Sequence, residues 1–504
     1  MGTDVPGRFN MFYISTRDTS ASPVKVTAAE AIKKGLAPDK GLYMPTSIPT
    51  LPEGEIERLA SLPYNKRAAD ILAMFLDDYN YDELLADCTE AYSEARFPGG
   101  AAPLANIGNG VYSLELWHGP TCAFKDMALQ IMPRLLSRAL VMTGERRIAH
   151  ILVATSGDTG KAALEGYKDV PGIEIDVFYP VDGVSTMQKM QMATQEGENV
   201  RVCSVIGNFD DTQSGVKTIF ADNDLAQKAE ENGFFFSSAN SINWGRLAPQ
   251  IVYYISAYCD LVKNGDIQNG DKINVCVPTG NFGNIFAAYI AREMGLPLAR
   301  LICASNANNV LTDFINTGVY DRTREFYKTM SPSMDILISS NLERLLFLLG
   351  GAEVTASCME QLASCGKYKA PDDVMAKIRS VFSGYCCSEE ETATTIGKVF
   401  TENKYLADPH TCVALGSVEK YRAETNDNTL VVVASTASPY KFGQDVCKAI
   451  GADLTSDAPA DIISCLENAS GTKAPAPLVR TLTMPVRFTK VIDADKMADF
   501  VFNG

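Results

Sequence analysis

The sequence predicts an α/β fold with a mostly parallel sheet, covered by helices on both sides and preceded by a helix-rich N-terminal domain. Beyond residue 100, short apolar segments alternate with helical patterns, which is typical of parallel strands joined by helices. These segments are apolar on both faces rather than on one, so both faces of the sheet are expected to be buried. Strands are predicted at 151–154, 173–179, 273–277, 301–304 and 430–434.

The first hundred residues differ from the rest, because they are polar, rich in helical patterns and closed by the turn sequence FPGG at 97–100. We therefore predict a separate N-terminal domain over 11–105, which opens with a strand at 12–15. Residues 1–10 differ in composition from the chain after Met11, which favours an added segment there.

Helices are predicted between the later strands, where apolar residues recur at helical spacing. The helix at 285–294 has a typical end, because Gly295 follows it and Pro297 comes soon after. The stretch near 350–400 is predicted as a helical insertion. The remaining helices are predicted at 125–140, 159–167 and 341–350.

Charge and composition disfavour several classes of partner. The chain has 504 residues, 46% of them hydrophobic, and a formal net charge of −16, which disfavours nucleic acid or an anionic membrane as partner. An anionic small ligand remains compatible, because a pocket has its own local field. No apolar run of about 18 residues occurs, so no membrane span is predicted. The N-terminus also lacks the pattern of a secretory signal.

The cysteines and histidines predict no metal site. The 13 cysteines are dispersed without CxxC pairs, which is typical of buried small hydrophobic residues in a reducing compartment such as the cytoplasm. The three histidines, His118, His150 and His410, are too few and too far from cysteines to predict a zinc site.

The segment HGPTCAFKD at 118–126 places Lys125 after a tight turn, at the start of a predicted helix and beside Phe124 and Cys122. Burial disfavours the ammonium form of lysine, which lowers its pKa and yields a nucleophilic amine. Such lysines form Schiff bases, most often with pyridoxal phosphate (PLP). The alternative is a solvent-exposed lysine on an amphipathic helix.

Two loops that follow predicted strands have the composition of anion sites. Ligands of open α/β sheets bind beyond the carboxyl ends of the strands. The loop TSGDTG at 155–160 offers hydroxyls and N–H groups at a helix N-terminus, although a plain capping turn would have the same composition. In PTGNFGN at 278–284, the glycines would let the backbone approach a phosphate; the alternative is a simple strand-to-helix turn.

Two further segments place polar groups where a ligand could meet them. STASPYKF at 435–442 follows the last strand, and its hydroxyls either contact a ring nitrogen or only cap the strand. SANSINWGR at 238–246 combines amides, hydroxyls and an arginine, which suit phosphate or carboxylate, although Asn-Ser runs commonly form turns.

Together, and in this order, these segments resemble the threonine synthase family, PLP enzymes of fold type II. The resemblance runs from about residue 12 to the C-terminus and is greatest to the longer form of the family, with its extra N-terminal domain. SANSINWGR and SPSMDILISSNLERLLF are the segments that indicate this family rather than the fold type alone. The matching segments are 118–126, 154–160, 238–246, 278–284, 331–347, 408–411 and 435–442.

The resemblance implies two open, twisted, mostly parallel α/β domains. The large, PLP-binding domain would comprise 106–150 and 230–504, and the small domain 151–229. Lys125 would form the covalent link to PLP and act as the catalytic residue, and Thr436 would meet the ring nitrogen. Asp158 would face the 3′ oxygen, where other fold-type-II members often have asparagine. The cofactor phosphate would be held by Gly280, Asn281, Phe282, Gly283 and Asn284.

By the same resemblance, a second set of residues binds the phosphate of the substrate, namely Thr155, Thr159, Asn240, Ser241 and Arg246. The implied reaction converts O-phospho-L-homoserine and water to L-threonine and phosphate, in a lyase of threonine biosynthesis, part of the aspartate-family pathway. Two anion sites fit this reaction, whereas a simple serine or threonine dehydratase needs only one. Ser438 stands where some relatives carry histidine, which leaves that position without an assigned role.

Two alternatives remain open at this point. A related phospho-lyase would release 2-oxobutyrate instead of adding water, and a non-catalytic PLP-binding protein would bind without turnover. A nicotinamide-dependent oxidoreductase is disfavoured, because no GxGxxG follows a strand. We expect a cytoplasmic monomer or homodimer that binds a small-molecule substrate and no metal.

Overall fold

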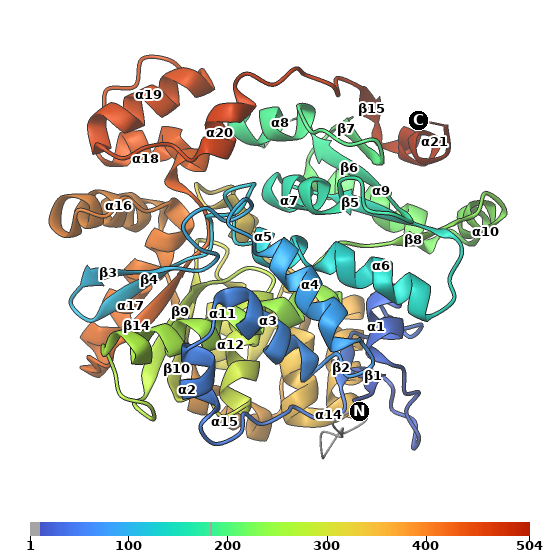
Figure 1. Cartoon of the computed structure of the whole chain (residues 1–504), viewed down its shortest axis with the longest axis horizontal. Helices are drawn as coiled ribbons and strands as arrows, with labels where there is room; N and C mark the ends of the chain where they lie inside the picture. Colours follow the sequence, from blue (N-terminus) through green and yellow to red (C-terminus); the bar gives the residue numbers. More distant parts are fainter. Residues whose placement is uncertain (1–10, 182–183, 504) are drawn as a thin grey trace.

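The computed structural model describes residues 11–181 and 184–503, and all structural statements refer to these residues. Two mostly parallel sheets organise the molecule, one above the other in Figure 1. The lower, six-stranded sheet has the order β13-β10-β9-β14-β4-β3 and is parallel except for the β3–β4 pair. Its strands are β3 (Leu104–Gly108), β4 (Val111–Glu115), β9 (Ile273–Pro278), β10 (Leu298–Ser305), β13 (Phe382–Cys386) and β14 (Val431–Ser435).

Alternating side chains of this sheet enter two different cores, which explains why its central strands are apolar on both faces. Val275 and Val277 of β9 pack toward helices α11 and α12, whereas Cys276 packs toward α17 on the opposite face. Covering both faces removes the need for polar positions. The helices around this sheet are α11 (Trp244–Asn264), α12 (Gly283–Glu293), α13 (Val310–Thr317), α15 (Asp372–Val381), α16 (Glu389–Asn403), α17 (Pro409–Thr425) and α18 (Gly443–Ala449).

The upper, five-stranded sheet is entirely parallel in the order β15-β7-β6-β5-β8. Its strands are β5 (Ile148–Ala154), β6 (Ile173–Pro180), β7 (Val200–Ile206), β8 (Phe234–Ser237) and β15 (Val491–Asp493). Its helices are α7 (Asp158–Tyr167), α8 (Thr186–Ala193), α9 (Phe209–Ala221) and α10 (Asn223–Glu231).

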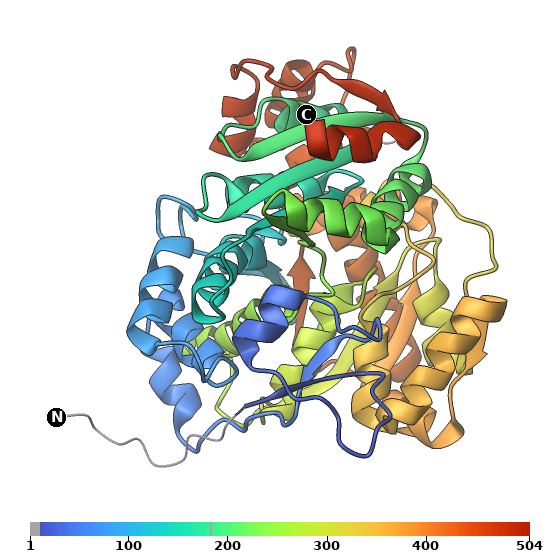
Figure 2. The ribbon, with the colours of Figure 1, turned by 90° about the vertical axis from the view of Figure 1, so that its right-hand side faces the viewer.

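The C-terminal segment returns to the upper sheet. Met497 and Phe500 of α21 (Met497–Asn503) pack on Phe178 of β6, and Figure 2 shows this helix in red against the green strands. Two strands of this sheet, β8 and β15, lie outside 151–229 in the sequence. The segments that lead there are η2 (Pro439–Phe442), α19 (Pro459–Ser470), α20 (Ala476–Thr481) and η3 (Ala494–Lys496).

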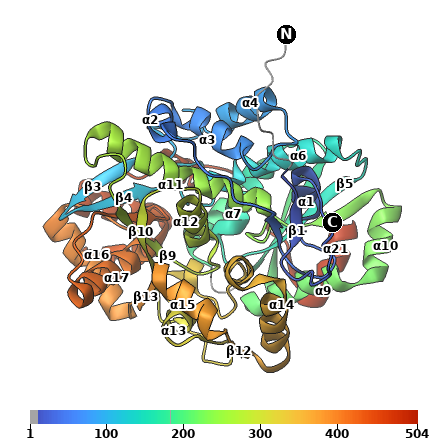
Figure 3. The same ribbon diagram turned by 90° about the horizontal axis from the view of Figure 1, so that it is seen from below.

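The N-terminal domain is mainly helical, with one small antiparallel pair of strands. Its helices α2 to α4 lie on one side of the molecule and α13 to α15 on the opposite side (Figure 3). Tyr13 of β1 packs on Trp244 of α11, which fastens this domain to the large sheet. Its elements are β1 (Tyr13–Ser15), α1 (Ala28–Lys34), β2 (Tyr43–Pro45), α2 (Glu55–Ala60), α3 (Tyr64–Ala73) and α4 (Tyr81–Ala91).

The helix predicted over 125–140 is in fact two helices, α5 (Asp126–Leu129) and α6 (Met132–Met142). Pro133 lies in the first turn of α6, where its missing N–H breaks the hydrogen-bond ladder of one continuous helix. The freed carbonyl of Leu129 lies against Gly166, where an added Cβ would come within 1.9 Å of that oxygen.

The helix predicted at 341–350 continues as α14 (Leu342–Cys365) past a break at Gly351, whose φ is +81°. Between 350 and 400, the chain forms helices and also β13, which joins the edge of the six-stranded sheet. This stretch also contains β12 (Lys367–Lys369), and the small elements before α14 are β11 (Val319–Asp321) and η1 (Pro332–Met334).

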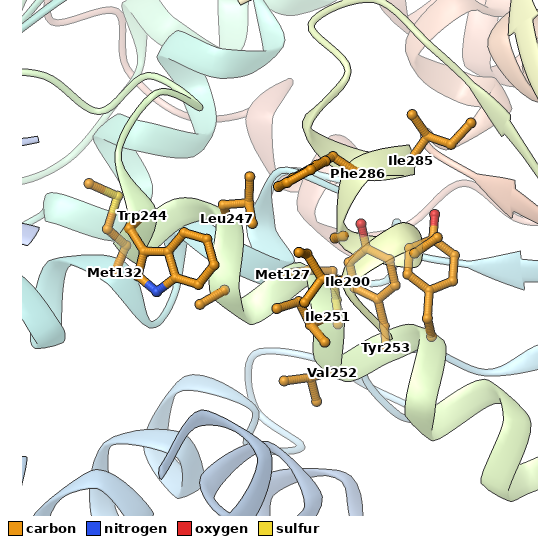
Figure 4. Packing of buried hydrophobic residues seen from close by; sticks show 14 of the residues in the cluster. Met127, Met132, Trp244, Leu247, Ile251, Val252, Tyr253, Ile285, Phe286 and Ile290 are labelled. Carbon is orange, nitrogen blue, oxygen red and sulfur yellow. The ribbon is translucent and has the colours of Figure 1, made fainter. Parts of the chain in front are cut away.

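A core of apolar side chains lies beneath the functional loops. Figure 4 shows Met127 of α5 between Leu247 and Ile251 of α11 and Ile290 of α12. Burying α5 on this core holds the start of that helix, and hence Lys125, in one place. Among the described residues, no helix combines the length and apolar character that a membrane crossing requires.

Candidate functional site

Lys125 directly precedes α5, at the end of the turn predicted from HGPTCAFKD. The turn is held by Asp126, whose carboxylate accepts from the Thr121 N–H at 2.8 Å and from the Thr121 hydroxyl at 2.6 Å. A Cβ at Gly119 would lie 2.5 Å from that carboxylate, so only glycine fits there. Burial raises the pKa of Asp126 to about 6.

The amine of Lys125 is buried, with 8% of the residue exposed, so it is not the solvent-exposed lysine of the alternative interpretation. Its Nζ donates to the Ser333 hydroxyl at 3.2 Å and lies 3.7 Å from Asp158 Oδ2. Burial lowers the pKa of Lys125 to about 8. The positive charges of Arg246 and Lys441 also lower this pKa, whereas the negative charge of Asp158 raises it. A neutral, nucleophilic amine is therefore accessible near neutral pH.

Asp158, at the N-terminus of α7, is a buried carboxylate between two lysines. Lys441 Nζ lies 2.7 Å from its Oδ1, and Gln188 Nε2 donates to the same oxygen at 2.8 Å. Burial alone would raise the pKa of Asp158, but Lys441 and Lys125 together hold it below its usual range. The carboxylate is therefore ionised at neutral pH.

The loop at 278–284 presents consecutive unpaired N–H groups. In the part of the chain that the structure describes, no acceptor pairs with the N–H groups of residues 280 to 285. Phe282 has a φ of +63°, an uncommon conformation for a bulky residue, and it starts α12. Six N–H groups at a helix N-terminus form a cradle for an anion.

The backbone of Gly280 and the side chain of Asn284 complete this cradle. A Cβ on Gly280 would lie 3.0 Å from the Ser333 carbonyl, so the loop and the Ser333 segment touch backbone to backbone. Asn284 accepts from the Tyr253 hydroxyl at 2.7 Å, while its buried Nδ2 has no partner among the described residues. An unpaired buried N–H donor at this position is costly unless a ligand accepts from it.

Thr436 directly follows β14 and is buried beside the lysine turn. Its carbonyl accepts from the Phe124 N–H at 2.8 Å, which places it one residue from Lys125. The neighbouring Ser435 has a different role, because its hydroxyl accepts from Trp117 Nε1 at 3.0 Å and from Thr411 at 3.1 Å.

The loop at 155–160 has both structural and unpaired polar groups. The Thr155 hydroxyl accepts from the N–H groups of Gly157 and Gly160, both at 2.9 Å, so it shapes the loop. Thr159 is half-buried, and no acceptor among the described residues pairs with its N–H. This loop therefore combines a locally satisfied hydroxyl with a free helix N-terminus.

Arg246, in the first turn of α11, is buried without a carboxylate. Its Nη1 donates to the Ala239 carbonyl at 2.7 Å, and in the described ranges no acidic side chain forms an ion pair with it. Burial lowers the pKa of Arg246 to about 10. A buried cation of this kind is suited to an anionic ligand.

The two remaining predicted residues lie just before Arg246. Ser241 is half-buried, and its hydroxyl accepts from Asn341 Nδ2 at 3.1 Å; the same amide donates to the Asn281 carbonyl at 3.0 Å. Asn341 thus joins the 238–246 segment to the 278–284 loop. The Asn240 side chain is exposed, and its carbonyl accepts from the Asn243 N–H.

The structure adds four residues to which the sequence reasoning gave no role. Lys441 lies inside STASPYKF and Ser333 inside SPSMDIL, so both motifs contained the signal. His410, which contacts Ser333, lies in the matching segment 408–411, whereas Gln188, which contacts Asp158, carries no local pattern that would mark it. Among the described residues, no cluster of side chains could hold a metal ion.

Comparison with protein families agrees with this arrangement. Residues 12–92 match the family described as the threonine synthase N terminus, and residues 100–436 match the pyridoxal-phosphate dependent enzyme family. Threonine synthase from Pseudomonas aeruginosa is 37% identical over 445 residues, which cover 87% of this chain and 90% of that protein.

Solved structures show the same fold over almost the whole length. PLP-bound threonine synthase from Brucella melitensis has a TM-score of 0.86 and 34% identity, covering 97% of this chain and 98% of that one. Yeast threonine synthase has a TM-score of 0.87 and 32% identity, covering 98% and 97%.

A second group of relatives is longer. Human Threonine synthase-like 1 is 39% identical over 455 residues, which cover 87% of this chain and 60% of that protein. The chain thus spans about 60% of the length of these relatives. From its two matched family regions and its close likeness to threonine synthases over nearly its full length, this chain belongs to the threonine synthase family of pyridoxal-phosphate-dependent enzymes.

Proposed function

We propose that this protein is a threonine synthase, a PLP-dependent lyase that converts O-phospho-L-homoserine and water to L-threonine and phosphate. The observation that carries the proposal is a buried amine, Lys125, whose pKa is lowered to about 8, with two separate groups of anion-binding residues around it. The first group is the 280–285 cradle and the second includes buried, carboxylate-free Arg246. A reaction in which the cofactor phosphate is the only anion to be bound would leave Arg246 without an anionic ligand.

The residues present fit the cofactor. The six unpaired N–H groups and the orphaned Asn284 Nδ2 suit its phosphate, and Lys125 suits the covalent link. Buried Thr436 would meet the ring nitrogen, and buried Asp158 would face the 3′ oxygen. When bound, PLP supplies an electron sink for negative charge that develops next to the amino group of the substrate.

The chain's own residues would then handle protons and the leaving group. Lys125, once displaced by the substrate amine, can take a proton from one carbon and return it to another, because burial lowers its pKa to about 8. Arg246, with Thr155, Thr159, Asn240 and Ser241, would hold the substrate phosphate while the Cγ–O bond breaks. Cγ gains a proton, and water supplies the hydroxyl that forms the new bond at Cβ.

The decisive experiment is incubation of purified protein with PLP and O-phospho-L-homoserine, followed by assays for phosphate, threonine and 2-oxobutyrate. Equal amounts of phosphate and threonine support the proposal. Phosphate with 2-oxobutyrate would identify a phospho-lyase, and no turnover with bound cofactor would identify a non-catalytic PLP-binding protein. Lys125→Ala protein serves as the control for cofactor-independent release of phosphate.

We also propose that this enzyme acts in threonine biosynthesis, within the aspartate-family pathway, as a cytoplasmic monomer or homodimer without a nucleic-acid partner. All 13 cysteines are free thiols and ten are buried, which supports a reducing compartment. Size-exclusion chromatography with light scattering tests the oligomeric state.

A further inference from the structure

Three buried charged side chains form one cluster next to the lysine turn. The Lys441 side chain is fully buried, and its Nζ lies 2.7 Å from Asp158 Oδ1. Lys125 Nζ lies 3.7 Å from Asp158 Oδ2, the other oxygen of the same carboxylate. One buried carboxylate is thus shared by two lysines, one on each oxygen.

Lys441 is held in this position by the chain around it. It comes from η2, and its Nζ also donates to the Thr121 carbonyl at 2.9 Å, in the turn that carries Lys125. Gln188 of α8 donates to the carboxylate oxygen that Lys441 contacts. The Lys441 ammonium is therefore fixed between the Thr121 carbonyl and Asp158, and Gln188 holds the carboxylate that it faces.

The charges in this cluster balance only when one lysine is neutral. With both lysines protonated, the cluster has one net positive charge, and with Lys125 neutral it has none. A net charge in a buried environment is unfavourable. Asp158 therefore favours the protonated form of Lys125, while Lys441 opposes it by neutralising Asp158.

We propose that Lys441 is a positioning residue that acts through Asp158 and disfavours a proton on the Lys125 nitrogen. The inference rests on the proposed function, because it takes Lys125 as the reactive lysine. The other charged groups near the cluster are Arg246 of α11, which also disfavours a proton on Lys125, and Asp126 of α5, which faces Lys441. Lys161 of α7 lies farther away and pairs with Glu165 at 3.2 Å.

The test is an absorbance titration of the full-length protein loaded with PLP. The visible absorbance of lysine-bound PLP changes when the nitrogen supplied by Lys125 gains or loses a proton, and the midpoint is read from spectra without turnover. In Lys441→Met, the midpoint should rise by about one pH unit, because Asp158 acts on Lys125 alone. In Asp158→Asn, it should fall, because Lys441 then only repels a proton on Lys125.

The double variant Asp158→Asn/Lys441→Met distinguishes this charge effect from a packing effect. It removes one charge of each sign, so the midpoint should return close to that of the unchanged protein. Lys161→Met is the matched control, because it removes another buried, ion-paired lysine and should leave the midpoint in place. Thermal unfolding of every variant reports its stability separately.

The role of Lys441 would be overturned if Lys441→Met left the midpoint unmoved, or if both single variants shifted it in the same direction. If Lys441→Met does not fold, Asp158→Asn is compared with the double variant, which differs from it only by the loss of Lys441. The proposal requires the midpoint of the double variant to be higher than that of Asp158→Asn. A protein that never forms the absorbance of lysine-bound PLP would contradict the proposed function instead. The two failures are therefore distinguishable.

Discussion

His410 Nε2 accepts a hydrogen bond from the backbone N–H of Ser333 at 3.1 Å. The other ring nitrogen of His410 lies 2.7 Å from the Asp408 carboxylate. Since an ionised carboxylate only accepts, the proton lies on Nδ1 and Nε2 is left as the acceptor. Through this pair, Asp408 holds the segment whose Ser333 hydroxyl touches Lys125.

His410→Ala should therefore weaken both the fold and the site. The change leaves the half-buried Ser333 N–H without its acceptor, which costs about 0.5–1.5 kcal/mol of unfolding free energy, and it frees the Ser333 hydroxyl from its place beside Lys125. We expect a lower urea midpoint together with a lower kcat/KM. His118→Ala is the control, because that half-buried histidine pairs with Glu115 and does not touch Ser333. Unchanged urea unfolding and kinetics in His410→Ala would refute this link.

The lowered pKa of Lys125 predicts how the cofactor-free protein takes up PLP. Below pH about 8 the amine is increasingly protonated and unreactive, so the uptake rate should rise with pH and level off above that value. If the lysine had its ordinary pKa of 10.5, the rate of PLP uptake would instead continue to rise with pH up to about 10.5. Stopped-flow absorbance measures the rate.

Borohydride reduction should attach PLP permanently to Lys125 in the unchanged protein. Lys125→Ala should lose both this PLP label and turnover. Peptide mapping by mass spectrometry locates the label. A label on Lys441 or Lys161 would show that the wrong lysine has been assigned.

Gly283→Val should weaken PLP binding far more than it weakens folding. The tightest contact of a Cβ at Gly283 would be with Asn341 Nδ2 at 3.3 Å, which a small movement relieves, but the larger valine side chain narrows the approach to the N–H cradle. Fluorescence titration gives the PLP affinity, and thermal unfolding of the cofactor-free protein gives the stability. Saturation at the ordinary PLP concentration would contradict the assignment of the cradle.

Arg246→Ala should lower kcat/KM for O-phospho-L-homoserine at least about tenfold, because a charge-assisted hydrogen bond contributes roughly 1.5–3 kcal/mol. Arg246→Lys should restore part of the loss, since it keeps the charge without the planar fork. Initial rates of phosphate release provide the measurement, and the absorbance of lysine-bound PLP should persist.

Arg67→Lys is the control for a purely structural arginine, because buried Arg67 pairs with Asp260 at 2.7 Å, away from the loops of the candidate site. It should lower stability without a selective loss of substrate binding. If Arg246→Ala behaved like this control, the substrate-phosphate site would be wrongly placed.

Local pattern alone determined much of the fold and the candidate loops. Strands such as β9 have apolar residues on both faces because both faces are buried, and this is visible in a short window of sequence. The loops after them were predictable as well, since glycine, asparagine and hydroxyl residues at a strand-to-helix junction mark an anion cradle before any contact is known. The residue types at such a junction are sufficient to show which anion-binding groups it offers, because these groups belong to neighbouring residues in the sequence.

Only the tertiary structure decided which of these groups meet. Lys441, Ser333 and His410 are far from Lys125 in sequence, and no periodicity encodes the distances that join them to it. The same limit applies to β15 and α21 at the end of the chain. β15 joins the edge of the five-stranded sheet by pairing with β7, and α21 packs on that sheet. Burial of a charge depends on packing from several segments at once, so the lowered pKa of Lys125 and the Lys441–Asp158 pair became visible only when the whole chain was folded.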